Sequence, residues 1–368
     1  MFVLPATTNV SMKKIFHLFA VMLFPALLFA QSKKDEAHDL ALQGIHLVDQ
    51  GATNEGLKLL EKAHKLDPGN YNYVYEIGYA YYDRGDYKKA LKQFKATVKF
   101  DSCSAQCYQM LGNTYDMLGD SAAAFRSYNE GLQRFPGSGR LYLEKGNVFL
   151  ARNQSRKAEP YYEKGIELDP NFPSNYYHAA KYYLSSQDLV WGLIYGEIFM
   201  NLETNTKRTS EISKLLYSAY HDHITFKSDT SYSVDLTSNV IDISMLTNGK
   251  MTLPWPLIVY SPVFTMALIG EHSINLASLH RIRKNFVSLY YQNENGKKYP
   301  NVLFEFQQKI IDAGHFEAYN YWLLQRGDPE AYEDWKKRHE DEWEKFKDWF
   351  NNADMGLSND HKFYKAQY

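Results

Sequence analysis

The stretch GYAYYDRGDYKKALKQF, residues 78–94, predicts a helix, a tight turn and a second helix. Gly78 lies inside the first of these helices, where glycine costs roughly 1 kcal/mol relative to alanine. A small residue returns at the same place every 34 residues, as Gly44, Gly78, Gly112, Gly146 and Ala180. A cost repeated at a fixed interval indicates a repeated packing requirement, and so a chain built from similar two-helix units.

Further positions recur with the same spacing. Large residues lie three positions after the small one, at Leu47, Tyr81, Tyr115, Phe149 and Tyr183. A second small residue occurs at Gly56, Ala90, Ala124, Ala158 and Gly192, and a large one follows at Leu60, Phe94, Tyr128 and Tyr162. Since residues three apart share a helix face, we expect the small residues of paired helices to face each other. The aromatic residue three positions on should fill the adjoining gap.

This pattern resembles the tetratricopeptide repeat, a helix-turn-helix unit that stacks on its neighbours. The resemblance covers residues 37–204, about five units, of which the fifth is modified because Gly196 stands in the place of the large aromatic residue. It implies an all-α fold, a right-handed superhelix of helical hairpins. The 34-residue period is lost beyond Thr204, so we expect a repeat solenoid over 31–204 and a mainly helical C-terminal domain with a small β excursion over 205–368.

In the tetratricopeptide family the first helix of each unit lines a concave groove, and positions 2, 5, 9 and 12 of the unit point into it. The resemblance therefore implies a groove that binds a protein segment. Its predicted residues are Asn72, Tyr75, Tyr79, Tyr82, Gln109, Asn113, Asp116, Arg140, Asn147, Tyr177 and Lys181. Tyrosine rings offer contact area, and amide side chains can bond to an extended backbone. The alternative is a groove filled by the chain's own C-terminal half.

Some family members clamp a partner's C-terminal carboxylate with a lysine in this groove. Here Gln109 stands where the lysine is needed, which argues against that activity. The formal net charge of −2 provides no overall basic field for a nucleic acid. We therefore expect a protein or peptide partner and no nucleic acid.

The N-terminal sequence MKKIFHLFAVMLFPALLFA, residues 12–30, has two lysines before an apolar run. This layout is typical of a secretory signal peptide over residues 1–30, with the start possibly at Met12 and cleavage after Ala30. The alternative is a membrane anchor, for which the apolar run is short. We expect an exported protein, in the periplasm or outside the cell, soluble or peripherally associated and without a membrane span after cleavage.

The two cysteines, Cys103 and Cys107, are four residues apart. They could form a local disulfide in an oxidising compartment or remain two structural thiols. A zinc site would need two further ligands, and no histidine lies near them in the sequence. We expect no metal and no cofactor.

The second half of the chain predicts a helix over 208–222 and β-prone runs between 224 and 253, with a turn at Asn248-Gly249. An apolar segment over 257–270 predicts a buried helix. Four more helices are expected over 275–292, 302–313, 316–325 and 328–351. The last carries an aromatic stripe of Tyr332, Trp335, Trp343, Phe346 and Phe350, which could be core or a partner-binding surface.

The sequence contains no glycine-rich phosphate loop, nucleophile elbow or HExxH motif, so we expect no catalytic residues and a non-enzymatic scaffold of the cell envelope. One alternative is an enzyme whose acid/base site gathers His221, His223, His272 or His315 with carboxylates, with His280 and Glu317 as further candidates. Another is a cell-wall glycan binder, if groove tyrosines and Trp191 or Trp255 form a flat exposed platform.

Overall fold

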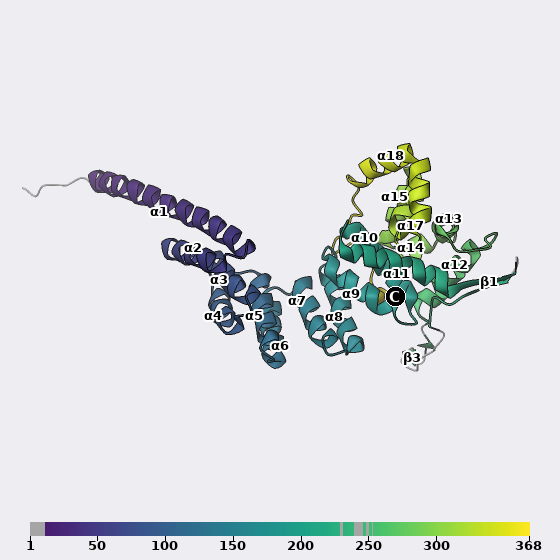
Figure 1. Ribbon diagram of the computed structural model, residues 1–368, viewed down its shortest axis with the longest axis horizontal. Coiled ribbons are helices and arrows are strands. Elements are labelled where there is room, and N and C mark those ends of the chain that lie inside the picture. The colour runs from purple at the N-terminus through teal and green to yellow at the C-terminus, as the bar shows by residue number, and fades with distance from the viewer. Residues whose placement is uncertain (1–11, 229–230, 239–245, 248–249, 252) are drawn as a thin grey trace, which may run out of the picture. The chain divides into compact units, whose positions relative to one another are not determined.

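The structure is a computed structural model that describes residues 12–228, 231–238, 246–247, 250–251 and 253–368. Its contacts divide the chain into two compact units, Met1–Gly131 and Leu132–Tyr368. The predicted all-α class is confirmed, since helices joined by short loops make up most of the described residues (Figure 1). The domain limit expected at Thr204 stays a prediction.

The first unit is built from two-helix hairpins. Its helices are α1 (Met12–Asp49), α2 (Thr53–Leu66), α3 (Tyr71–Asp83), α4 (Tyr87–Thr97), α5 (Ala105–Met117) and the greater part of α6 (Ser121–Arg134). The loop after each first helix holds a glycine in the left-handed region, Gly51, Gly85 and Gly119, with φ of 83°, 82° and 84°. In each case the next amide bonds back to the carbonyl of the large residue at Leu47, Tyr81 or Tyr115. This is the Schellman ending of a helix, and it makes every turn alike.

Aromatic rings lie against the periodic glycines inside the hairpins. A Cβ added at Gly78 would lie 2.9 Å from Phe94, one at Gly112 would lie 2.1 Å from Tyr128, and one at Gly146 would lie 2.4 Å from Tyr162. The expected packing of small residue on small residue therefore holds for Gly44 and Gly56 but is wrong for these three glycines. The ring that fills the space belongs to the second helix, four residues after its own small position. Glycine is needed because no side chain fits beside that ring.

Substituting Gly112 by alanine is expected to lower the free energy of unfolding by about 1 to 3 kcal/mol, even though alanine favours the helix. The Tyr128 ring is only 1% exposed and has little room to retreat. Gly69→Ala is the matched control, because nothing lies within 4 Å of its added Cβ. Urea denaturation followed by far-UV circular dichroism measures both variants. Equal midpoints for the two would contradict the packing described.

The second unit begins with α7 (Gly139–Leu150), α8 (Ser155–Leu168), α9 (Pro173–Leu184), α10 (Leu189–Leu202) and α11 (Lys207–His223). The helix expected over 208–222 is confirmed as α11, which packs on α9 and α10 (Figure 1). The Arg208 guanidinium donates to Ser174 Oγ at 3.0 Å and Tyr177 donates to Glu211 at 2.5 Å, each across a separation of 34 residues. Thus α11 stacks as one more first helix, although Lys214 occupies its glycine position.

Two short hairpins follow. Strands β1 (Ile224–Ser228) and β2 (Ser231–Val234) pair antiparallel, as do β3 (Leu246–Thr247) and β4 (Lys250–Met251). The predicted run over 239–244 and the turn at Asn248-Gly249 lie outside the described residues. The helix expected over 257–270 is a π-helical turn, η2 (Pro256–Tyr260), followed by α12 (Ser261–Ala267). This segment is buried on one side only, since Ile258, Met266 and Ile269 are exposed. Its helix is irregular because Pro262 has no N–H to continue a regular α pattern.

The remaining elements are α13 (Leu276–Gln292), α14 (Asn295–Lys298), α15 (Val302–Asp312), α16 (Phe316–Leu324), α17 (Pro329–Arg338), α18 (Glu340–Phe350) and η3 (Lys365–Gln367). The single helix expected over 328–351 is wrong, since His339 separates α17 from α18. Its ring stacks on Trp335 at 4.8 Å, and its Nδ1 lies 2.9 Å from the Trp335 carbonyl oxygen. Of the aromatic stripe, Tyr332, Trp335, Trp343 and Phe346 are buried, so these four belong to the core.

The C-terminal segment, residues 353–368, is fastened to the repeat helices of the second unit. Phe363 is fully buried, stacked on Trp191 at 5.6 Å and edge-on to Trp255 at 5.0 Å. The Lys365 amide donates to Tyr195 Oη at 2.8 Å, and Asn171 donates to the Leu357 carbonyl at 3.1 Å. Trp191 and Trp255 are therefore interior residues.

Candidate protein-binding surface

Helix α3, the first helix of the second repeat, has one exposed ring among its three predicted groove tyrosines. Tyr79 is 41% exposed. Tyr75 is 9% exposed because its ring packs edge-on against Phe94 and its hydroxyl accepts a hydrogen bond from Gln106 Nε2 at 2.7 Å. The Tyr82 ring lies edge-on to Tyr87 at 5.4 Å. Tyr79 is thus the exposed member of the predicted tyrosine row, and Asn72, about two turns earlier on the same helix, is also exposed.

Two predicted groove amides are used inside the hairpins. The Tyr128 hydroxyl donates to Asn113 Oδ1 at 2.6 Å, and the Tyr162 hydroxyl donates to Asn147 Oδ1 at 3.2 Å. Asn147 also donates to Glu144 at 3.1 Å. The same bond occurs in two successive repeats, so these asparagines position the second-helix tyrosines, and their oxygens are occupied.

Three other predicted groove residues also have local contacts. Asp116 accepts a hydrogen bond from Ser121 at 2.7 Å. The Arg140 guanidinium lies over the Phe172 ring at 5.4 Å. Gln109 is half-buried on α5. Asp116 and Arg140 therefore contact residues of their own repeats.

Tyr177 and Lys181 line a cavity of about 300 Å³ in the second unit. The other lining residues are Leu150, Ser155, Tyr162, His178, Tyr182 and Ser185. The His178 ring stacks on Tyr162 at 5.1 Å and meets Tyr177 edge-on at 5.1 Å. The fourth and fifth first helices, α7 and α9, contribute Leu150, Tyr177 and Lys181. We call this the aromatic cavity; Tyr162 and His178 were not among the predicted site residues.

The aromatic cavity has neutral walls and one ion pair at its rim. Burial, with smaller effects from Lys181 and Arg208, lowers the pKa of His178 to about 4, so its imidazole is neutral at pH 7. Lys181 Nζ lies 2.8 Å from Glu211 and 5.1 Å from the centre of the Tyr177 ring. Such a cavity suits an apolar or aromatic side chain, while the ion pair offers a donor and an acceptor to a nearby backbone.

The contacts of α11 bear on the alternative of a self-filled groove. Arg208 and Glu211 of this helix reach Ser174, Tyr177 and Lys181, so residues beyond 204 cover part of the fifth unit's first helix. The C-terminal segment instead contacts mainly the second helices, where the Lys365 amide donates to Tyr195 Oη of α10 at 2.8 Å and Lys362 donates to the Glu167 carbonyl of α8. Lys365 Nζ also lies 3.2 Å from Tyr183 Oη, near the end of α9. The aromatic cavity stays unfilled by either segment.

The histidines considered for an acid/base site do not gather in one place. His221 pairs with Asp222 at 2.9 Å on the surface, while His223 lines a separate cavity of about 260 Å³ with Asp235. His280 lies 4.0 Å from Glu317, but this carboxylate also accepts the Trp335 indole N–H at 2.9 Å. The His315 ring packs on Trp349.

The other chemistry considered from the sequence is also not assembled. Trp191 and Trp255 are 2% and 1% exposed, so they form no glycan platform. Cys103 and Cys107 are buried and no disulfide joins them. Burial raises the pKa of Cys107 to about 11, which keeps it a thiol. Within the described ranges, no group of three or more His, Cys, Asp or Glu residues is placed to hold a metal ion, and no helix combines the length and apolarity needed to cross a membrane.

Comparison with known proteins identifies the repeats. Residues 47–113 match one sequence model of the tetratricopeptide repeat, and residues 105–137 and 139–172 match another, so the chain contains tetratricopeptide repeats. No curated protein matches the chain.

Solved structures that this chain resembles include MamA, PilF and a thermophilic tetratricopeptide protein. MamA is 22% identical, with coverage of 46% of this chain and 92% of that one, and a TM-score of 0.35. PilF of Pseudomonas aeruginosa is 19% identical, with coverage of 52% and 87% and a TM-score of 0.43. A thermophilic tetratricopeptide protein of Thermus thermophilus is 19% identical, with coverage of 49% and 98% and a TM-score of 0.40. Tetratricopeptide proteins are protein-interaction scaffolds, as a class generally without enzymatic activity.

Proposed function

We propose that this protein is a non-enzymatic scaffold that binds an extended segment of a protein partner along the first helices of its repeats. The aromatic cavity carries this proposal, because it opens where the repeat pattern predicts a binding face and includes the predicted residues Tyr177 and Lys181. One apolar side chain of the partner fills the cavity, and its neighbouring backbone bonds to the Lys181–Glu211 pair. In the first unit, Tyr79 is a separate exposed ring that a partner can contact.

The N-terminal sequence supports a location outside the cytoplasm. Two lysines before an apolar run support export, and the protein acts in the cell envelope or outside the cell. The net charge of −2 favours a protein partner over a nucleic acid. Recovery of the protein from a periplasmic or extracellular fraction, with Gln31 as its first residue, tests this location; a cytoplasmic protein with an intact N-terminus overturns it.

The variant Leu150→Asp tests the binding site. Leu150 is 40% exposed at the cavity, so a carboxylate there should oppose an apolar anchor without disturbing the core. We expect peptides selected from a random library on the purified protein to lose about tenfold or more in affinity, measured by fluorescence anisotropy. Leu118→Asp is the matched control, since Leu118 is 38% exposed and does not line the cavity.

Two results would overturn the proposal. One is the failure of any peptide to bind saturably. The other is an equal loss of affinity in both variants, which would place the bound peptide elsewhere. Circular dichroism of each variant establishes that the helices are intact.

A further inference from the structure

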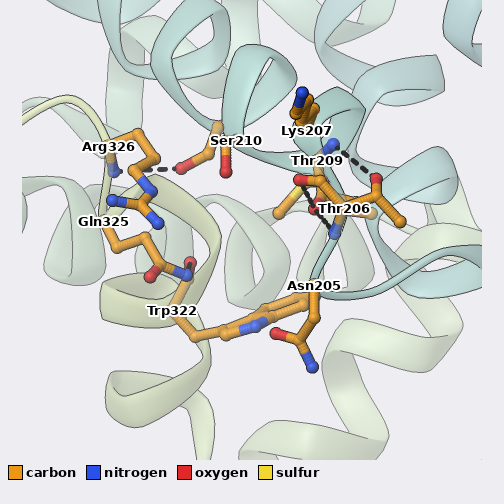
Figure 2. A pocket seen from close by; sticks show the side chains of 10 residues that line it. Asn205, Thr206, Lys207, Thr209, Ser210, Trp322, Gln325 and Arg326 are labelled. Atoms are coloured by element: carbon orange, nitrogen blue, oxygen red, sulfur yellow. Dashed lines mark hydrogen bonds between the residues drawn. The ribbon is translucent and has the colours of Figure 1, made fainter.

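A second cavity, of about 370 Å³, lies between the start of α11 and the end of α16 in the second unit. Figure 2 shows the residues that line it: Met200, Asn205, Thr206, Lys207, Thr209, Ser210, Ser213, Trp322, Gln325 and Arg326. None of them lines the aromatic cavity. We call this space the polar cavity. Its size is typical of a small-molecule site.

The polar cavity is rich in cations and contains no carboxylate. Lys207 and Arg326 line it, and neither forms an ion pair within the part of the chain that the structure describes. Arg208 and Arg281, by contrast, each pair with a glutamate. A site with two unpaired cations and no acidic residue favours an anion.

The neutral polar groups of the polar cavity also favour an anion. The side chains of Asn205 and Ser210 have no hydrogen-bond partner among the described residues, and both can donate. The first turn of α11 lies beside them, capped by Thr206, whose side chain accepts from the Thr209 amide at 3.2 Å. The positive end of the 17-residue helix adds to the attraction for negative charge.

Trp322 gives evidence that does not depend on the helix end. Trp322 is only 9% exposed, and its indole N–H has no hydrogen-bond partner among the described residues. Its ring packs on Tyr319 and Phe350, at 5.6 Å and 4.8 Å, which fixes its position. Figure 2 shows the indole extending along one side of the cavity toward Asn205. The indole nitrogen keeps some access to solvent, so this fixed donor is open to an acceptor in the cavity.

We infer that the polar cavity binds a small phosphate monoester. A phosphate monoester carries a charge of about −1.5 to −2 at pH 7, which matches Lys207 and Arg326 together, whereas a carboxylate would balance only one of them. In the dianion, the three terminal oxygens accept hydrogen bonds and donate none, as the set of donors requires. The phosphate fills a fraction of the cavity, and the rest holds the organic group beside the Trp322 ring.

Isothermal titration calorimetry of the full protein with phenyl phosphate, benzoate and inorganic phosphate tests this assignment. We expect saturable binding of phenyl phosphate, about tenfold tighter than benzoate, because the phosphate meets both cations. Inorganic phosphate should bind more weakly than phenyl phosphate, because it lacks the ring. Equal binding of benzoate, or no saturable binding of phenyl phosphate, overturns the phosphate assignment.

Three variants locate the site. Arg326→Gln and Lys207→Gln should each weaken phenyl phosphate binding about tenfold, and Trp322→Phe, which retains a ring and removes the N–H, about threefold. Lys214→Gln is the matched control, since Lys214 is an exposed lysine of α11 that does not line the cavity. Lys207, Arg326 and Lys214 lie outside the core, so their substitution leaves the fold intact. Binding that is equal in Arg326→Gln and Lys214→Gln overturns the proposal.

Discussion

Replacing Arg283 by methionine is expected to lower the free energy of unfolding by about 3 to 5 kcal/mol, because it leaves the Glu197 carboxylate buried without its cation. Arg283 and Glu197 are 5% and 2% exposed, and Arg283 Nη2 lies 2.6 Å from Glu197 Oε1. The same carboxylate oxygen accepts from Gln307 Nε2 at 2.7 Å and from Tyr319 Oη at 2.9 Å. Without the guanidinium these two hydrogen bonds remain, but the buried carboxylate has lost its counter-charge.

Arg281→Met is the matched control, two residues away on the same helix. Arg281 also bonds to a glutamate with two nitrogens, Nε and Nη2, at 2.7 Å and 2.6 Å from Glu271, but its side chain is 55% exposed. Its loss should cost less than about 1 kcal/mol. Adding Glu197→Gln to Arg283→Met should recover part of the stability, since it removes the unpaired charge. Urea denaturation of the four proteins measures these differences, and equal costs for the two arginines would contradict the expectation.

The buried Glu197–Arg283 pair helps to fix the packing of the C-terminal helices on the last repeat hairpin. Glu197 lies on α10, Arg283 on α13, Gln307 on α15 and Tyr319 on α16. Residues 189–200 of α10 are buried throughout, so this helix has no free face and needs a partner for its one carboxylate. The network supplies that partner and joins the last hairpin to helices that lie far along the chain.

The sequence predicts local repeated structure far better than such long-range contacts. The 34-residue spacing marks every hairpin because each one needs a small residue beside a large ring, and residues within one hairpin meet that need. The turn glycines at Gly51, Gly85 and Gly119 have the same spacing, with Asn153 next in phase at a φ of 56°. This signal is readable in the sequence and would have located the turns. Glu197 and Arg283 are separated by 86 positions, and no such period relates them.

The candidate site was predictable in part. The repeat positions identify Tyr177 and Lys181, but the helix period alone does not show that Asn113 and Asn147 bond to second-helix tyrosines. His178 was missed because it lies next to a groove position and is not in one. The polar cavity brings together the start of α11 and the end of α16, which the sequence does not relate. Its residues have ordinary surface composition, so only the tertiary fold distinguishes them.

The stability of the protein is expected to fall as the pH rises from about 5 to about 8, through the titration of Glu163. Burial raises the pKa of this carboxyl to about 7, with a smaller contribution from Glu159, and the charge of Lys365 opposes the change. The Tyr195 and Tyr183 hydroxyls donate to Glu163 at 2.8 Å and 2.9 Å. A folded-state pKa above the unfolded one means that the folded protein holds its proton more tightly. The stabilisation is complete below the unfolded pKa and is lost as the pH passes through 7.

Glu163→Gln isolates this effect, because the amide resembles the protonated carboxyl and cannot ionise. At about pH 5 the variant and the wild type should be similar in stability, and at about pH 8 the variant should be more stable by about 2 to 3 kcal/mol. Glu342→Gln, at an exposed position of α18, should follow the wild type at both pH values.

The titration of Glu163 also affects the C-terminal segment, since Glu163 lines a cavity of about 540 Å³ together with Tyr364 and Lys365. Ionisation adds a negative charge next to Glu159 there, and Lys365 offsets it only while the segment is docked. A difference between Glu163→Gln and wild type that is the same at both pH values would show that Glu163 does not titrate in this range.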